Sequence, residues 1–405
     1  MTSTVRTIYA ARAIRGFGDG FAVIVLPAYL VEIGLDPFGI GVVATAALLG
    51  SATLTLAFGF LAVRNGLRRL LLCGAALMIL AGLGFPYAEH FAVLVTVAFV
   101  GTINPNSGDS GILVPLEHAI LAGQASDRER TQTFANYSFI GGMMAAAGSL
   151  AAAVPDLLVS LGFTRIDALR SMFFGYAALG VVSANLYARL PSGTQSIGTK
   201  GEEVSSLGPS RAKVYKLAAL FSLDAFAGGF AVQSLVALWL FERFGVSLAA
   251  AAVFFFWANV LSAFSYPVAV RLARRFGLIN TMVFTHIPSS LCLFVLVFAN
   301  DVNLVYALWL TRSLLSQMDV PTRTSYVMAV VTPPERAAAA SVTAVPRGLA
   351  SAISPSIAGA LFSNSLFGWP FVICGALKIT YDLLLLYSFR HDRPPEELAE
   401  KASQP

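Results

Sequence analysis

Apolar residues follow one another along this chain in long blocks, which short polar segments interrupt. A hydrocarbon core about 30 Å thick is crossed by a helix of roughly 20 apolar residues. Measured against that length, the blocks predict an all-α membrane protein with twelve membrane-spanning helices. Their expected ranges are 7–34, 39–62, 69–87, 91–122, 132–158, 168–190, 213–241, 247–270, 278–299, 303–331, 337–363 and 369–389.

One long polar segment, residues 191–211, interrupts the middle of the chain. It is rich in Gly, Ser, Pro and charge and has no periodicity, which predicts a flexible linker. The linker separates the spans into six and six. We therefore expect a first six-helix bundle at 1–190, a second at 212–390 and a polar tail at 391–405.

The charged residues indicate how the spans are oriented. With the N-terminus in the cytoplasm, most of the loop Arg and Lys are cytoplasmic, and the opposite side keeps Arg165, Arg170 and Arg243. Cytoplasmic loops of membrane proteins carry such an excess of basic residues. We expect both termini to be cytoplasmic (N-in, C-in) and, by the same charges, the linker and the tail as well.

Composition supports a membrane protein, because 12% of the residues are charged and soluble domains average about 25%. The net charge of +5 does not indicate a nucleic-acid partner, since the basic residues are spread over short loops. Cys73, Cys292 and Cys374 each lie in an apolar block and predict neither a disulfide nor a metal site. The sequence also contains no nucleotide-binding loop. We expect no cofactor and no metal, and energy from an ion gradient or the substrate's own gradient.

The two halves of the chain resemble each other. "GFAV" occurs at 20–23 and again at 229–232, each time in the first span of a half. Asp109 in the fourth span matches Asp319 in the tenth. Duplicated helical halves with sites at their interface are typical of transporters.

The loop between the second and third spans resembles a family signature. In the major facilitator superfamily this loop reads G-x-L-A-D-R-x-G-R-K/R. The matching positions in this chain are Gly59, Leu61, Ala62, Arg64, Gly66, Arg68 and Arg69. The chain departs from the signature at Val63, where the family has an acid that helps latch the cytoplasmic side, and at Leu67.

With its twelve spans and central linker, the whole chain resembles this family. The resemblance implies two pseudo-symmetric bundles, transport by alternating access, and a central cavity lined by the first, fourth, seventh and tenth spans. The Gly-Pro antiporter motif of the family is absent from residues 139–149. The direction of transport therefore stays open.

The four spans expected to line the cavity each contain an acid, and these acids are Asp19, Asp109, Asp224 and Asp319. Charge within hydrocarbon is costly and marks a functional pathway. At about 100° per residue, Arg15 shares a face with Asp19. Arg323 likewise shares a face with Asp319. Asp224 and Asp109 have no base three or four residues away, and burial without a base favours proton uptake. We predict proton coupling at Asp224 and Asp109, with Asp19 as a third candidate.

The repeat aligns Asp224 with Arg15. We hypothesise that Arg15 exchanges between Asp19 and Asp224 during transport. A purely structural Arg15–Asp19 pair is the alternative. For Lys378 and Asp382 in the last span, and for His286 in the ninth, packing roles are favoured.

Other polar residues in the spans are candidates for substrate binding or gating. The fourth span is interrupted by "TINPNSGDSG" (102–111), which predicts a flexible, polar cavity wall, with a plain proline kink as the alternative. The full set of binding or gating candidates is Arg15, Asp319, Arg312, Arg323, Asn104, Asn106, Arg347, Gln233 and Gln317.

The sequence favours a monomeric secondary transporter, not an enzyme, that exports a small amphipathic or toxic compound in exchange for protons. The alternative is an importer or exchanger of a small anionic metabolite that is clamped by arginines. A remote alternative is an intramembrane serine hydrolase at Ser110 in "GDSG", which needs a nearby histidine. The expected location is the bacterial inner (plasma) membrane.

Overall fold

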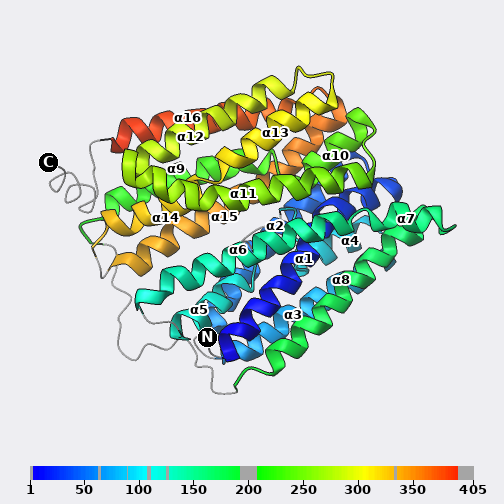
Figure 1. Ribbon diagram of the computed structural model, residues 1–405, viewed down its shortest axis with the longest axis horizontal. Coiled ribbons are helices and arrows are strands. Elements are labelled where there is room, and N and C mark those ends of the chain that lie inside the picture. Colours follow the sequence, from blue (N-terminus) through cyan, green and yellow to red (C-terminus); the bar gives the residue numbers. More distant parts are fainter. Residues whose placement is uncertain are drawn as a thin grey trace. The chain divides into compact units, whose positions relative to one another are not determined.

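The computed structural model describes residues 3–62, 65–88, 90–106, 111–124, 127–191, 208–332 and 335–390. Within these ranges the regular elements are helices, which Figure 1 colours from blue to red along the chain. They fall into two compact units, each of which draws on separate stretches of the chain. The first consists of Met1–Thr199, Val232–Val260 and Pro355–Leu366, and the second of Lys200–Ala231, Leu261–Ser354 and Phe367–Pro405.

The first half of the chain contains helices α1 to α8. Their bounds are α1 Ser3–Glu32, α2 Pro37–Ala62, α3 Leu67–Gly84, the short 3-10 helix η1 Phe85–Tyr87, α4 Phe91–Val100, α5 Val114–Gln124, α6 Asp127–Ala151, α7 Val154–Ser160 and α8 Arg165–Ala188.

The second half of the chain contains α9 to α16. Their bounds are α9 Arg211–Gly229, α10 Gln233–Phe244, α11 Leu248–Phe276, α12 Leu278–Leu296, α13 Val302–Ser316, α14 Asp319–Val330, α15 Arg336–Asn364 and α16 Trp369–Phe389. The units differ from the two predicted bundles, because α10, the start of α11 and the end of α15 pack with the first unit. The division into six and six spans stays a prediction.

Nine helices in the described part of the chain are long and apolar enough to cross a membrane. They correspond to the predicted spans one to three, five to nine and twelve. Two further spans are broken. The fourth is divided into α4 and α5, with Gly101 and Pro105 in the break, and the tenth into α13 and α14 around Gln317. The eleventh, α15, is continuous but rich in polar residues. The apolar blocks of the sequence thus predicted where the spans lie. Two of these spans break where helix-breaking or polar residues interrupt the apolar block.

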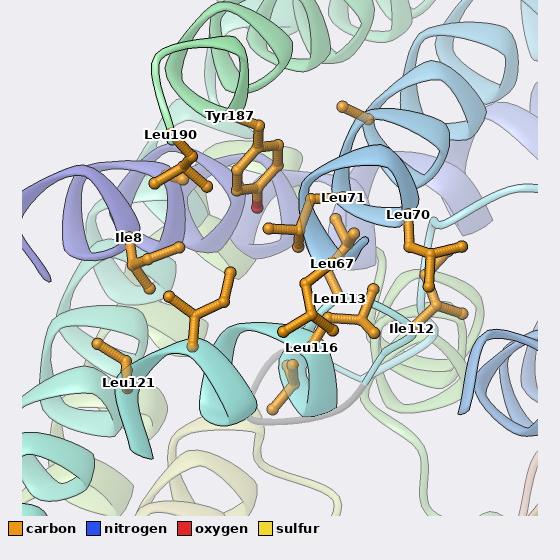
Figure 2. Packing of buried hydrophobic residues seen from close by; sticks show 14 of the residues in the cluster. Ile8, Leu67, Leu70, Leu71, Ile112, Leu113, Leu116, Leu121, Tyr187 and Leu190 are labelled. Atoms are coloured by element: carbon orange, nitrogen blue, oxygen red, sulfur yellow. The ribbon is translucent and has the colours of Figure 1, made fainter. Parts of the chain in front are cut away.

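The first unit packs around a cluster of buried apolar side chains from α1, α3 and α5, which Figure 2 shows. Ile8, Leu71 and Leu121 have no exposed surface in this cluster. The ring of Tyr187 from α8 enters it from the side. In the second unit, α9, α12, α14 and α16 share another cluster, which includes Met282 and Tyr381.

Helices α1 and α6 pack closely through glycine. A Cβ at Gly20 would overlap the carbonyl oxygen of Ala145, and one at Gly148 would overlap that of Phe17. Small residues allow membrane helices to approach in this way. The approach fixes the position of Asp19, one residue before Gly20.

Substituting Gly20 with alanine should therefore destabilise the protein by about 1–3 kcal/mol, since overpacking forces backbone shifts. The matched control is Gly175→Ala on α8, where a Cβ meets no atom within 4 Å. This control should be neutral or slightly stabilising, because alanine favours helix. Denaturant unfolding in detergent micelles measures both. Equal stability of the two variants would contradict the close packing.

Candidate functional site

The first unit contains a buried ionic cluster centred on Glu117. Glu117 lies on α5 and has no exposed surface. Its carboxylate pairs with the guanidinium of Arg15 from α1. It also accepts hydrogen bonds from Tyr137 at 2.5 Å and from Tyr187 at 2.7 Å. A buried charge is tolerated when it is paired and its remaining lone pairs are satisfied, and Glu117 meets both conditions.

The predicted ion pair between Arg15 and Asp19 does not form, because Arg15 pairs with Glu117 instead. Both residues lie on α1 at the expected four-residue spacing, but the guanidinium turns to Glu117 and Tyr137. Glu117 is the more deeply buried acid and therefore has the greater need of a cation. The prediction failed because the sequence analysis left Glu117 out of the intramembrane acids.

Asp19 is half-buried, and its carboxylate is bonded by a hydroxyl group. Tyr176 on α8 donates to the Asp19 carboxylate at 3.3 Å. The same hydroxyl lies 3.2 Å from that of Thr102, in the break between α4 and α5. A chain of hydroxyl groups therefore leads from this helix break to Asp19.

A second chain of hydrogen bonds joins five other polar residues of this unit. Asn104 accepts from the backbone of Asn106 at 3.0 Å, and Asn106 accepts from the backbone N–H of Gln233 at 2.9 Å. Gln233 donates to Asn259 at 3.1 Å, and Asn259 donates to Ser149 at 3.1 Å. The break in the fourth span thus caps the N-terminus of α10, where helix amides lack partners. Asn104, Asn106 and Gln233, predicted separately, are brought together here.

The second unit contains an ionic cluster centred on Asp224 of α9. One carboxylate oxygen accepts from Lys378 of α16 at 2.6 Å, and the other accepts from Arg323 of α14 at 3.3 Å. Arg323 also bonds to Asp319 at 2.8 Å, which confirms that predicted pair. Asp224 was expected to be uncompensated because its own helix holds no base. Two other helices supply the bases instead.

His286 of α12 joins this cluster. Its Nδ1 lies 3.0 Å from Asp382, and its Nε2 lies 3.3 Å from the Lys378 ammonium. The expected Lys378–Asp382 pair therefore does not form, since Lys378 bonds to Asp224 and Asp382 to His286. Because an ammonium group only donates, the contact with Nε2 places the imidazole proton on Nδ1, facing Asp382.

Arg312 on α13 and Arg347 on α15 are half-buried. The guanidinium of Arg312 lies 4.8 Å from the ring centre of Trp309, and Arg347 is within electrostatic reach of Arg323 and Asp224. The Nε of each arginine is buried and has no hydrogen-bond partner among the described residues. Gln317, which is the C-cap residue of α13, is half-buried.

Several predicted positions lie outside the described residues, among them Asp109, Ser110 and Arg64. Of the loop motif, Gly59 lies near the end of α2, Gly66 precedes α3, and Arg68 lies in its first turn. Their role in the loop stays a prediction.

The loop between α14 and α15 is anchored by Glu335, which the sequence analysis did not single out. Its carboxylate accepts from the hydroxyl groups of Thr332 at 2.6 Å and Ser210 at 2.7 Å, and from the backbone of Gly208. These hydrogen bonds lower the pKa of Glu335 to about 2. The anchor therefore favours the ionised form of Glu335.

The part played by Glu117 and by the tyrosines around it is not predicted from the sequence, and His286 is expected there only to pack. Glu117 carries a readable signal, as an acid within an apolar block (112–121). The tyrosines carry none, because a tyrosine in an apolar helix is ordinary. Their meeting depends on how α5, α6 and α8 pack.

Comparison with known proteins agrees with this fold. The family model described as Major Facilitator Superfamily matches residues 8–311 and 217–405. The uncharacterized membrane protein YJR124C of Saccharomyces cerevisiae is 24% identical, over 95% of this chain and 94% of its own length. Because this relative is a yeast protein, the bacterial location stays a prediction.

Solved structures are similar in fold over nearly the whole chain. The inward-open xylose transporter XylE from E. coli has a TM-score of 0.73 at 15% identity and covers 98% of this chain and 99% of its own. The nucleoside transporter NupG has 0.73 at 12%, with 96% and 100% covered. The human organic anion transporter MFSD10 has 0.63 at 14%, with 95% and 100% covered.

Family membership also removes the hydrolase alternative at Ser110, since the members are transporters. The chain is an integral, multi-pass membrane protein that belongs to the major facilitator superfamily of secondary transporters.

Proposed function

We propose that this protein exports a small molecule in exchange for protons, by alternating access, and that Asp19 carries the proton. The proposal includes the predicted topology of twelve spans in two pseudo-symmetric bundles with cytoplasmic termini. The excess of basic residues in the cytoplasmic loops supports that orientation. The duplication of the two halves supports the alternation.

One observation carries the choice of Asp19. Among the described acids inside the spans, Glu117, Asp224, Asp319 and Asp382 each contact a basic side chain. Asp19 instead receives a single long hydrogen bond from Tyr176. Protonating a paired acid leaves its buried base uncompensated, which is costly. Protonating Asp19 breaks no ion pair, so it is the acid that can take and release a proton most readily.

The geometry around Asp19 also offers a route for that proton. The Tyr176 hydroxyl donates to the ionised carboxylate and can accept from the protonated one. Thr102 extends the chain to the break between α4 and α5. Broken membrane helices are tolerated where protein or water satisfies the freed backbone groups. The proton would reach Asp19 from this side.

Proteoliposomes that contain a trapped pH dye test the proposal. Cationic, neutral and anionic solutes are added outside, and solute uptake and internal pH are followed together. Exchange predicts that the entry of a transported solute makes the interior more alkaline. Solute entry without any change of internal pH would overturn proton coupling, and acidification would overturn exchange in favour of symport.

A further inference from the structure

Asp382 of α16 is a fully buried acid that is held by a histidine. Its side chain has no exposed surface. The base four residues earlier on the same helix, Lys378, donates to Asp224 of α9 at 2.6 Å instead. Both carboxylate oxygens of Asp382 face the imidazole of His286 on α12, whose Nδ1 lies 3.0 and 3.1 Å from them. The acid therefore depends on His286 for a counter-charge.

A neutral imidazole gives Asp382 a hydrogen bond but no charge. An ionised carboxylate is tolerated inside a protein when it is both hydrogen-bonded and paired with a cation. The imidazole becomes that cation by binding one proton, and histidine is the side chain that ordinarily changes charge between about pH 5 and about pH 8. Protonating Asp224 or Asp319 would leave a base without its acid. Protonating His286 creates an ion pair instead.

The second ring nitrogen of His286 faces the ion pair between α16 and α9. Nε2 lies 3.3 Å from the Lys378 ammonium and 3.9 Å from an oxygen of Asp224. In the neutral ring Nε2 accepts from Lys378, because Nδ1 carries the proton that faces Asp382. In the protonated ring Nε2 is a donor, and two cations then compete for the same oxygen of Asp224. Their repulsion weakens the bond from Lys378 to Asp224.

Other charged groups of the second unit lie on the helices around His286. The helices packed against α12 are α13, α14 and α16. Together with α9 they carry the titratable and charged side chains of this region, which are Asp224, Arg312, Asp319, Arg323, Lys378, Tyr381 and Asp382, and Arg347 of α15 is within electrostatic reach of Asp224. Of these, Asp382 and Lys378 are within hydrogen-bond distance of the imidazole. Arg323 contacts the other oxygen of Asp224 at 3.3 Å, so Asp224 keeps a partner when Lys378 withdraws.

We propose that His286 and Asp382 form a second proton-binding site, and that a proton bound there releases Lys378 from Asp224. His286 holds the proton as imidazolium, and Asp382 stabilises and orients it. The released ion pair connects α16 to α9, which is the first part of the seventh span and thus of a helix expected to line the cavity. The inference goes beyond the proposed role of Asp19, because it adds a second site at which protons act on the transporter.

Solid-state NMR of the purified protein, labelled with nitrogen-15 in its histidine rings, tests the proton site without any proton gradient. Such spectra distinguish the two neutral tautomers from imidazolium. Between about pH 9 and about pH 5, the His286 signal should change from neutral, with its proton on Nδ1, to imidazolium. The spectrum of His286→Gln identifies the signal, and the control His90→Gln, at an exposed position, should retain it.

The acid partner is tested by Asp382→Asn, in which His286 should stay neutral at acidic pH because imidazolium then lacks its carboxylate. The matched control is Asp301→Asn at the N-cap of α13, which should show imidazolium as the wild type does. Asp19→Asn should show it too. A failure of Asp19 as the proton carrier would therefore leave this result unchanged, and the two proposals fail separately.

The release of Lys378 is measured by dipolar coupling between its Nζ, labelled with nitrogen-15, and the carboxyl carbon of Asp224, labelled with carbon-13. The Asp224→Asn spectrum identifies this coupling. We expect the coupling to be strong at alkaline pH and lost at acidic pH in the wild type. In His286→Gln it should be the same at both pH values, because the imidazolium that repels Lys378 cannot form.

Several results would overturn the proposal. One is a His286 signal that keeps a single protonation state throughout, and another is a folded Asp382→Asn variant that titrates like the wild type. A wild-type coupling that ignores pH, or one that is still lost in folded His286→Gln, would also overturn it. The thermal midpoint reports whether each variant is folded. If His286→Gln does not fold, replacing the other histidines, His90, His118 and His391, with glutamine leaves the His286 signal alone in the spectrum.

Discussion

Replacing Asp19 with asparagine should abolish proton-driven transport and spare exchange of solute for solute. Asparagine is close in size and can still accept from Tyr176, but it cannot take up a proton. Uptake into proteoliposomes driven by a pH gradient should fall to the level of empty vesicles. Counterflow, in which internal and external solute exchange without net proton movement, should continue at a rate similar to that of the wild type.

The matched control for this variant is Asp301→Asn, at the exposed N-cap of α13. Asparagine caps helices as well as aspartate does, so this variant should transport like the wild type. Tyr176→Phe, which removes the single hydrogen bond to Asp19, should slow gradient-driven uptake without abolishing it. Full gradient-driven uptake in Asp19→Asn would show that another residue carries the proton. Loss of counterflow together with net uptake would make Asp19 a residue that the solute itself requires.

Replacing Glu117 with leucine should be the most destabilising single change in the first unit. It leaves Arg15 buried without its partner, and removing one member of a buried pair costs about 3–5 kcal/mol. Tyr137 and Tyr187 lose their acceptor as well. Denaturant unfolding in micelles measures the loss.

The double variant Arg15→Met with Glu117→Leu should recover about 2 kcal/mol or more of that loss, because replacing both charges with apolar groups removes the desolvation cost. This rescue separates an ionic role from simple packing. If the two substitutions add, with no recovery in the double variant, Arg15 and Glu117 do not depend on each other in the way that the contact implies.

The helices of this protein were predictable to a large extent, and the contacts between them were not. Long apolar blocks located nine of the spans directly, because crossing a bilayer imposes a minimum length. The helix-breaking Pro105 and the polar residues around it also marked the break in the fourth span. In the tenth span, the same length rule missed a break at Gln317, although polar residues such as Ser316 and Asp319 flank it.

The candidate site shows the limit more clearly. Spacing along one helix predicted Arg323 with Asp319 correctly, because four residues return a side chain to the same face. The same rule assigned Arg15 to Asp19 and Lys378 to Asp382, and both bases bond across helices instead. A local rule ranks partners within a helix but says nothing about a competing acid on another helix. Glu117 and Asp224 were such competitors, and their contacts depend on tertiary packing.

The central claim is that Asp19 changes protonation, and infrared spectroscopy of the purified protein tests it most directly. Difference spectra between alkaline and acidic buffers report carboxyl groups that gain a proton, and subtracting the Asp19→Asn spectrum isolates this residue. We predict that the wild type gains a protonated-carboxyl band that Asp19→Asn lacks and Asp301→Asn retains. Identical difference spectra for the wild type and Asp19→Asn would contradict the account.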